Sequence, residues 1–109
     1  MIDVRRYLTE SGRDVFGEWL KDLPDDQARA KVAARVLRLA AGNFGDCKSL
    51  RDGIWELRID WRPGYRVYFA KEGRLIVLLL CGGDKRKQSA DIERAINYWR
   101  DYKARTRKT

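Results

Sequence analysis

The stretch GIWELRIDWRPGYRVYF, residues 53–69, decides the fold of this chain. Between residues 55 and 61, apolar side chains alternate with charged ones, and the alternation resumes at 65–69 after Arg-Pro-Gly at 62–64. Strict alternation on both sides of a Pro-Gly turn is typical of a half-buried β-hairpin. One face of this hairpin builds a core, and the question is what the other face does.

The even-numbered side chains of both strands share that other face. With a tight turn, Arg58 would lie opposite Tyr68 and Asp60 opposite Arg66; with a slightly longer loop, Arg58 would face Arg66. Either register brings the two guanidinium groups close to Glu56. The face is therefore either a binding site for an anion or, on a merely wet sheet, a cross-strand ion-pair ladder of Glu56, Arg58, Asp60 and Arg66.

Length and composition predict one folded domain over residues 1–109. The chain is 44% hydrophobic and 37% charged, and its length suffices to bury one core. No apolar run reaches the ~18–20 residues that cross a bilayer, and the N-terminus lacks the hydrophobic stretch of a signal peptide. Cys47 and Cys81 form neither a metal-ligand spacing nor a disulfide framework. We expect a cytoplasmic protein.

The positive charge is unevenly distributed along the chain. The net charge is +8, yet residues 1–45 are nearly neutral, while residues 46–88 carry ten Lys and Arg against six Asp and Glu. Residues 89–109 carry six against three. This excess indicates a polyanionic partner, nucleic acid first, although solubility alone would also account for it.

Hydrophobic periodicity predicts an α+β fold. We expect a strand at 2–8, a helix reaching Leu23, a second helix with Pro24 in its first turn and Gly42 at its end, and a final helix capped by Ser89. An antiparallel meander at about 47–51, 54–61, 65–71 and 74–81 lies between them. The last of these strands is apolar on both faces, which predicts a central or doubly covered position. The tail 103–109 reads as frayed.

A basic segment follows the last strand. Gly82 and Gly83 would let the backbone approach a ligand closely, and Lys85, Arg86 and Lys87 come directly after them. The spacing of a Walker loop is absent. The anion expected here is therefore a nucleic-acid backbone rather than a nucleoside triphosphate.

Three stretches, KSLRDGIWELRID, PGYRVYF and LIVLLLCGGDKRKQSADIERAINYW, resemble the RelE/ParE superfamily of toxins from bacterial toxin–antitoxin modules. Within it, the chain is most similar to the HigB-like, phage-derived addiction-module killer proteins. The resemblance implies a four-stranded antiparallel sheet packed on helices and cleavage of mRNA in the ribosomal A site. It also implies a helix-turn-helix antitoxin, with which the toxin would form a hetero-oligomer.

The resemblance also implies roles for particular residues. Arg66 matches the phosphate-stabilising arginine, Arg58 a catalytic cation of the preceding strand, and Lys85 with Arg86 the basic turn after the last strand. Substrate-positioning or RNA-binding roles fall to a weaker set, Lys48, Arg51, Tyr68 and Lys87.

The chemistry of RNA cleavage is consistent with these residue types. It needs a base for the 2′-hydroxyl, charge stabilisation at the phosphate and an acid for the leaving oxygen. The chain has no histidine and no evident carboxylate cage, so neither a metal nor another cofactor is expected. Arginine is a poor base, and a lysine among other cations is a better one. Ile92 lies near the place of a tyrosine found in RelE relatives; Tyr68 could replace it, and base and acid stay unassigned.

Two other functions share this fold. A ParE-like toxin would poison DNA gyrase without cleaving RNA, but it would not need clustered arginines next to a basic loop. A passive RNA-binding module would expose stacking aromatic residues, whereas the tryptophans fall at positions that we expect to face the core, namely Trp19, Trp55, Trp61 and Trp99.

Overall fold

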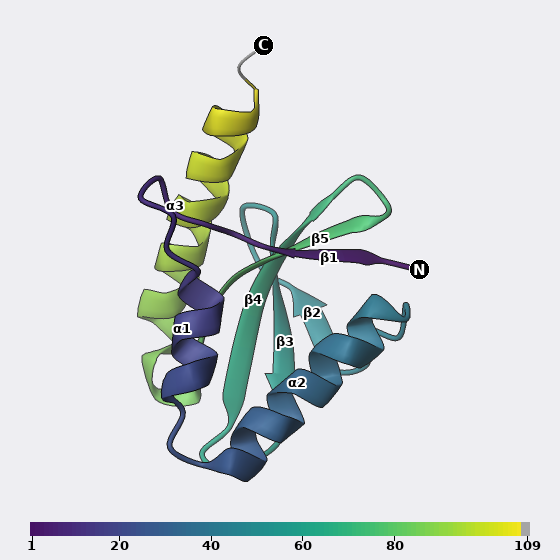
Figure 1. Ribbon diagram of the computed structural model, residues 1–109, viewed down its shortest axis with the longest axis vertical. Coiled ribbons are helices and arrows are strands. Elements are labelled where there is room, and N and C mark those ends of the chain that lie inside the picture. The colour runs from purple at the N-terminus through teal and green to yellow at the C-terminus, as the bar shows by residue number, and fades with distance from the viewer. Residues whose placement is uncertain (108–109) are drawn as a thin grey trace.

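The computed structural model of the protein describes residues 1–107, in which a five-stranded sheet lies between helices (Figure 1). The elements in chain order are β1 (Asp3–Arg6), α1 (Val15–Asp22), α2 (Asp26–Ala40), β2 (Cys47–Ser49), β3 (Ile54–Ile59), β4 (Tyr65–Glu72), β5 (Ile76–Asp84), the 3₁₀-helix η1 (Lys85–Lys87) and α3 (Gln88–Thr106). The strand order is β1-β5-β4-β3-β2. The predicted α+β class and element order are confirmed.

The sheet differs from the expected antiparallel, four-stranded one at its first strand. β1 adds a fifth strand at the edge and runs parallel to β5, with Asp3 paired to Ile76 and Arg6 to Leu79. The other neighbouring strands are antiparallel. The chain between β1 and β5, which holds α1, α2 and the other three strands, supplies the long connection that a parallel pair needs.

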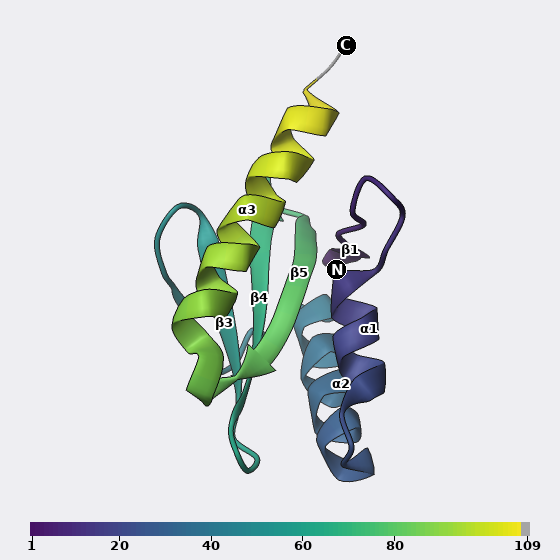
Figure 2. The ribbon, with the colours of Figure 1, turned by 90° about the vertical axis from the view of Figure 1, so that its left-hand side faces the viewer.

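Each face of the sheet has its own apolar core. Leu57, Val67 and Phe69 pack towards α1 and α2, whereas Ile54 and Leu80 pack towards α3. Figure 2 shows α3 on one side of the sheet and the α1–α2 pair on the other. β5 lies inside the sheet and contacts both α1 and α3. The predicted central, doubly covered position of this strand is confirmed.

The boundaries of α2 and α3 differ from the sequence expectations at three places. The side chain of Asp25 caps α2, so Pro24 precedes the helix. α3 begins at Gln88, directly after η1, and Ser89 lies inside its first turn rather than at the cap. The tail expected to fray is helical through Thr106, while residues 108–109 lie outside the described part. None of the helices in residues 1–107 has the length and apolarity to cross a membrane.

The glycine pair at the end of β5 serves packing instead of ligand approach, which corrects the sequence interpretation. A Cβ atom at Gly82 would overlap the ring of Trp19 on α1. A Cβ atom at Gly83 would overlap the carboxylate of Asp91 on α3. Both helices therefore approach the backbone of β5 more closely than any larger residue would permit.

Candidate functional site

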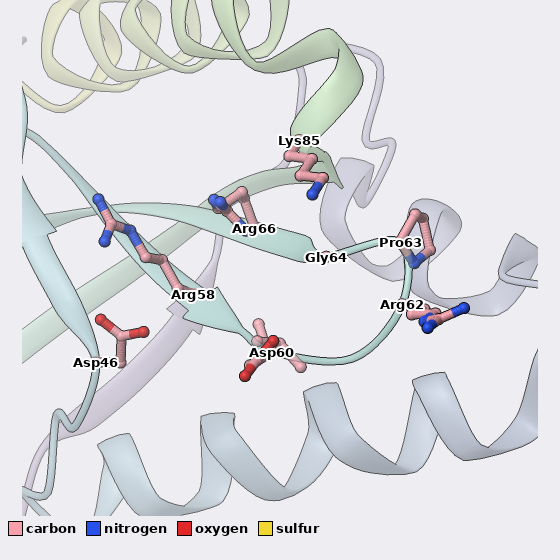
Figure 3. Close-up of a pocket in the computed structure, with 9 residues that line it drawn as sticks. Asp46, Arg58, Asp60, Arg62, Pro63, Gly64, Arg66 and Lys85 are labelled. Atoms are coloured by element: carbon pink, nitrogen blue, oxygen red, sulfur yellow. The ribbon is translucent and has the colours of Figure 1, made fainter.

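An open pocket of about 260 Å³ lies at the end of the β3–β4 hairpin (Figure 3). It is lined by Arg58, Arg62, Arg66 and Lys85, by Asp46 and Asp60, and by Ile59, Pro63 and Gly64. The hairpin and the β5–η1 junction, which are separate in sequence, supply most of this lining. Four cations facing two carboxylates give the pocket a positive character suited to an anionic group.

Arg58 and Arg66 form the centre of the site. They are direct partners across β3 and β4, so the register is the one with the longer loop. The Arg58 side chain is 35% exposed and the Arg66 side chain 17%. Within residues 1–107, Arg66 donates one hydrogen bond, from Nη1 to the carbonyl oxygen of Tyr65 at 3.3 Å. Its Nε is buried and has no hydrogen-bond partner within residues 1–107, so the donors left for a ligand are those of the terminal nitrogens.

The face that carries these arginines is largely covered, which corrects the expectation of a wet sheet face. Glu56 is fully buried and accepts from Arg58 Nε at 3.1 Å, and it lies 3.7 Å from Arg66 Nε. The predicted ion pairing is therefore present, but inside the protein. Asp60, the other expected member of the ladder, lies exposed at the pocket.

Lys85 reaches the pocket through a contact between two turns. Its backbone N–H donates to the carbonyl oxygen of Gly64 at 3.0 Å, which joins η1 to the hairpin turn. Gly64 has a φ of 96°, a conformation that other residues adopt at a cost. A Cβ atom there would lie 3.4 Å from Lys85 Cδ and 3.6 Å from Arg66 Nη1, so the glycine also leaves room for both cations.

Arg86 and Lys87 lie next to the pocket but not in it. They line a separate shallow hollow of about 460 Å³ that also includes Lys85. Arg86 is held by Asp84, at 2.8 Å between Nη2 and Oδ2, and this contact lowers the pKa of the aspartate. The structure thus brings Lys85 together with the arginine pair and leaves Arg86 beside them on the surface.

The weaker set of predicted RNA-binding residues is divided. Lys48 is exposed and pairs with Glu56 in the β2–β3 register, so it shares a sheet face with the arginines. Arg51 lies in the β2–β3 turn, at the other end of β3, and pairs with Asp52 and with Glu93 of α3.

Tyr68 does not face solvent. Its side chain is fully buried under α3, and its hydroxyl has no hydrogen-bond partner within residues 1–107. Burial, followed by the nearby Glu56 charge, raises the pKa of this tyrosine. A neutral hydroxyl inside the core cannot stack on a base or reach a phosphate, so the expectation that Tyr68 contacts RNA is wrong.

Sequence reasoning missed three residues of this region. Asp46 and Arg62 line the pocket, and Arg35 of α2 supports its wall. Arg35 donates to the backbone carbonyl oxygens of Phe44 at 3.1 Å and Asp46 at 3.3 Å, and to that of Arg58. Burial lowers its pKa. Helical periodicity alone gave no signal for it, because a long side chain at the edge of an apolar stripe can turn either way.

The tryptophans and the acidic side chains bear on two further expectations, an RNA-stacking surface and a metal site. The four tryptophans face the core as expected: Trp99 is buried, and Trp19, Trp55 and Trp61 are partly buried against the core. Trp61 lies in the β3–β4 loop, and its Nε1 donates to Asp25 at 3.0 Å. Residues 1–107 contain no group of three or more Cys, Asp or Glu side chains that could hold a metal ion.

Comparison with known families matches residues 18–99 to the family described as Phage derived protein Gp49-like (DUF891). This match covers well over half of the chain and includes every residue that lines the pocket. The chain belongs to this family. The Gp49-like family is a toxin-like member of the RelE superfamily, and membership implies an antitoxin as partner.

An uncharacterized protein is similar to this chain over most of its length. It comes from Haemophilus influenzae and is 54% identical over 80 residues, which cover 73% of this chain and 81% of the relative. The likeness supports a shared fold, and the description of the relative assigns no activity.

Proposed function

We propose that this Gp49-like protein is the toxin of a toxin–antitoxin module and that it cleaves mRNA, so that translation stops. The observation that carries the proposal is the direct pairing of Arg58 with Arg66 in one pocket with Lys85. Two guanidinium groups with open donors suit the charge that develops on a phosphate during 2′-hydroxyl attack. The resemblance to HigB-like killer proteins points to the same activity.

The proposed roles follow the position of each cation. Arg66, the less exposed arginine, stabilises the pentavalent phosphate, and Arg58 binds a non-bridging oxygen beside it. Lys85, Asp46 and Asp60 are the groups in the pocket that can accept or donate a proton, and the base and the acid are to be found among them. Tyr68 is excluded from proton transfer by its burial.

The neighbouring surface offers a path for the RNA strand. Lys85 borders both the pocket and the hollow that Arg86 and Lys87 line, so a strand whose scissile phosphate lies between the arginines can continue along η1. Such contacts read phosphates and not base edges. We therefore propose that sequence preference is weak in the free protein and that the ribosome, in the cytoplasm, presents the mRNA in the reactive geometry.

The partner proposed for this toxin is a helix-turn-helix antitoxin, with the two chains in a hetero-oligomer. The antitoxin would have to cover the pocket or hold the toxin away from the ribosome. The basic lining offers an acidic segment of the antitoxin a surface of opposite charge.

The experiment compares cleavage of one mRNA, naked and bound in a programmed 70S ribosome, with chelator present in both. We expect rapid, chelator-resistant cleavage on the ribosome and slow cleavage of naked RNA. In cells, incorporation of labelled amino acids should fall before that of thymidine. If thymidine incorporation fails first and double-strand breaks accumulate, the protein acts as a ParE-like gyrase poison instead.

A further inference from the structure

Glu56 is the one glutamate of residues 1–107 that is fully buried, and it lies beneath the pocket without lining it. Its carboxylate accepts from Arg58 Nε at 3.1 Å, lies 3.7 Å from Arg66 Nε, and accepts from the side-chain amide of Gln88 at 2.5 Å. Removing a carboxylate from water is costly unless such partners surround it. A buried charge at this place therefore indicates a specific role.

The arginine pair needs an anion of this kind. Like charges directly opposite each other on antiparallel strands repel, and Arg58 and Arg66 are direct partners. Glu56 lies nearest the Nε atom of each arginine: it accepts a hydrogen bond from that of Arg58, while that of Arg66 is buried within ion-pair distance but without a hydrogen bond. The terminal nitrogens are consequently turned away from the carboxylate, and those of Arg58 make no hydrogen bond within residues 1–107.

The third partner links the pair to the helix that covers the sheet. Gln88 is the first residue of α3 and directly follows η1, the segment that delivers Lys85. Its amide fixes the second carboxylate oxygen of Glu56, while the first faces the arginines. One buried carboxylate thus connects the arginine pair to the start of α3, next to the segment that carries Lys85.

We propose that Glu56 is the positioning residue of the site: it holds Arg58 and Arg66 side by side with their terminal nitrogens directed at the phosphate. This inference rests on the proposed RNA cleavage and adds to it the group that aligns the two cations. Glu56 touches no substrate itself, because it is fully buried and acts through the arginines.

The test uses Glu56→Gln, with Glu93→Gln as the matched control. Both substitutions remove one negative charge that pairs with arginine, but Glu93 pairs with Arg51 at the other end of the sheet. Affinity is measured for a 2′-O-methyl RNA oligonucleotide, which cannot be cleaved by its own 2′-hydroxyl. Cleavage is measured as the first-order rate on a programmed ribosome at saturating protein.

The expected result is a separation of binding from rate. Loss of the negative charge makes the pocket more positive, so Glu56→Gln should bind the oligonucleotide at least as tightly as the unaltered protein. Its cleavage rate should fall by about 10²-fold, because the guanidinium groups lose alignment. Glu93→Gln should change neither. An unchanged or faster rate for Glu56→Gln would show that Glu56 is only a counter-ion and would overturn the proposal.

Two further measurements keep the outcome decisive. If Glu56→Gln does not fold, Glu56→Asp keeps the charge and shortens the reach, and its rate should fall while binding stays the same; an unchanged rate overturns the proposal. NMR of the ¹⁵N-labelled protein without RNA should show a slowly exchanging Nε–H signal for Arg58, the arginine that hydrogen-bonds to Glu56, and Glu56→Gln should abolish it. If the signal persists in the variant, the positioning role is refuted. If the signal is lost but the parent protein cleaves no RNA, only the proposed function is refuted.

Discussion

The backbone N–H of Lys85 donates to the carbonyl oxygen of Gly64, and this hydrogen bond of 3.0 Å joins the turn of the hairpin to η1, which leads into α3. The pocket exists only where these two segments meet, because its lining comes mainly from the hairpin and from Lys85. A change at either partner should therefore affect the site more than the rest of the fold.

Gly64→Ala tests this junction. The positive φ should cost the variant about 1–2 kcal/mol of unfolding free energy, and the added methyl group would crowd Lys85 and Arg66. Gly73→Ala is the matched control, since Gly73 also has a positive φ, at 65°, but an added methyl group there would have no neighbour within 4 Å. Urea denaturation should show similar losses of unfolding free energy for the two variants, whereas only Gly64→Ala should reduce RNA cleavage. Equal cleavage by both variants would show that RNA cleavage does not depend on the contact between Gly64 and Lys85.

Arg66→Lys tests the need for a guanidinium group. Lysine keeps the charge but cannot form a bidentate contact to phosphate, so single-turnover cleavage should fall by about 10²–10³-fold. Arg66→Ala should lose cleavage as well and cost only about 1–2 kcal/mol of stability, because the buried Glu56 keeps Arg58 and Gln88 as hydrogen-bond partners. Phe69→Ala, in the fully buried core on the same strand, should cost about 3–5 kcal/mol. If Arg66→Ala destabilises the fold as strongly as Phe69→Ala, the arginine is structural.

Arg35→Ala tests the support of the pocket wall. The variant removes a side-chain donor from the backbone carbonyl groups of Phe44, Asp46 and Arg58, of which that of Asp46 keeps the backbone N–H of Arg58. We expect a loss of roughly 2–3 kcal/mol in unfolding free energy. Arg38→Ala, an exposed change on the same helix, should stay within about 0.5 kcal/mol of the parent protein. Equal unfolding midpoints for the two variants would contradict a supporting role of Arg35.

The pH dependence of stability should reveal the raised pKa of Asp91. Burial raises the pKa of this carboxyl above its ordinary value of 3.8, with Arg94 opposing the shift. The folded state therefore holds the proton more tightly than the unfolded state, and this contribution is lost as the pH rises through the folded pKa. Asp91→Asn has no proton to lose at this position and keeps its stability as the pH rises. The stability of the variant relative to the parent protein should therefore increase as the pH rises from below 3.8.

Asp101→Asn is the control with the opposite sign. The hydrogen bond from Tyr7, followed by the one from Arg105, lowers the pKa of Asp101, so this carboxylate stabilises the fold increasingly as the pH rises. Its variant should lose stability relative to the parent over the same titration. Parallel curves for the two variants in urea denaturation would contradict the assignment of Asp91.

The salt dependence of RNA binding should count the phosphate contacts. If three or four cations of the pocket engage a single strand, log affinity should fall with log salt at a slope of about −2 to −3. Arg62→Gln should make the slope shallower by about 0.7. Arg74→Gln, in the exposed turn between β4 and β5, should leave it unchanged. A common slope for both variants would show that charge on the whole surface, and not the pocket, binds the RNA.

The hairpin shows how far the sequence alone leads. Alternation with period two placed Glu56, Arg58 and Arg66 on one face, because successive side chains of a strand point to opposite sides of the sheet. The register stayed open between two loop lengths, and the structure selects the longer loop, which pairs Arg58 with Arg66. The sequence thus predicted that Glu56, Arg58 and Arg66 lie close together, but it did not predict which of them face each other across the strands.

Burial by distant helices explains most of what the sequence missed. Tyr68 and Glu56 carry polar atoms at positions that alternate with core residues, a pattern that ordinarily indicates a solvent face. α3 covers that face, and no periodicity within β3 or β4 encodes which helix will do so. Likewise Gly82 and Gly83 were interpreted as ligand-facing, since the sequence does not show that Trp19 and Asp91 pack directly onto them.

The place of β1 has a consequence for the synthesis of the protein. β1 lies at the edge of the sheet next to β5, with α1, α2 and three other strands between them along the chain. A growing chain can form the β3–β4 hairpin early, but its first strand has no neighbour until residues 76–84 have been made, and Lys85 follows immediately. Because contacts this distant in sequence form late, the sheet and the pocket should be completed together. If the protein cleaves mRNA on the ribosome as we propose, it would therefore stay inactive while its own synthesis is under way.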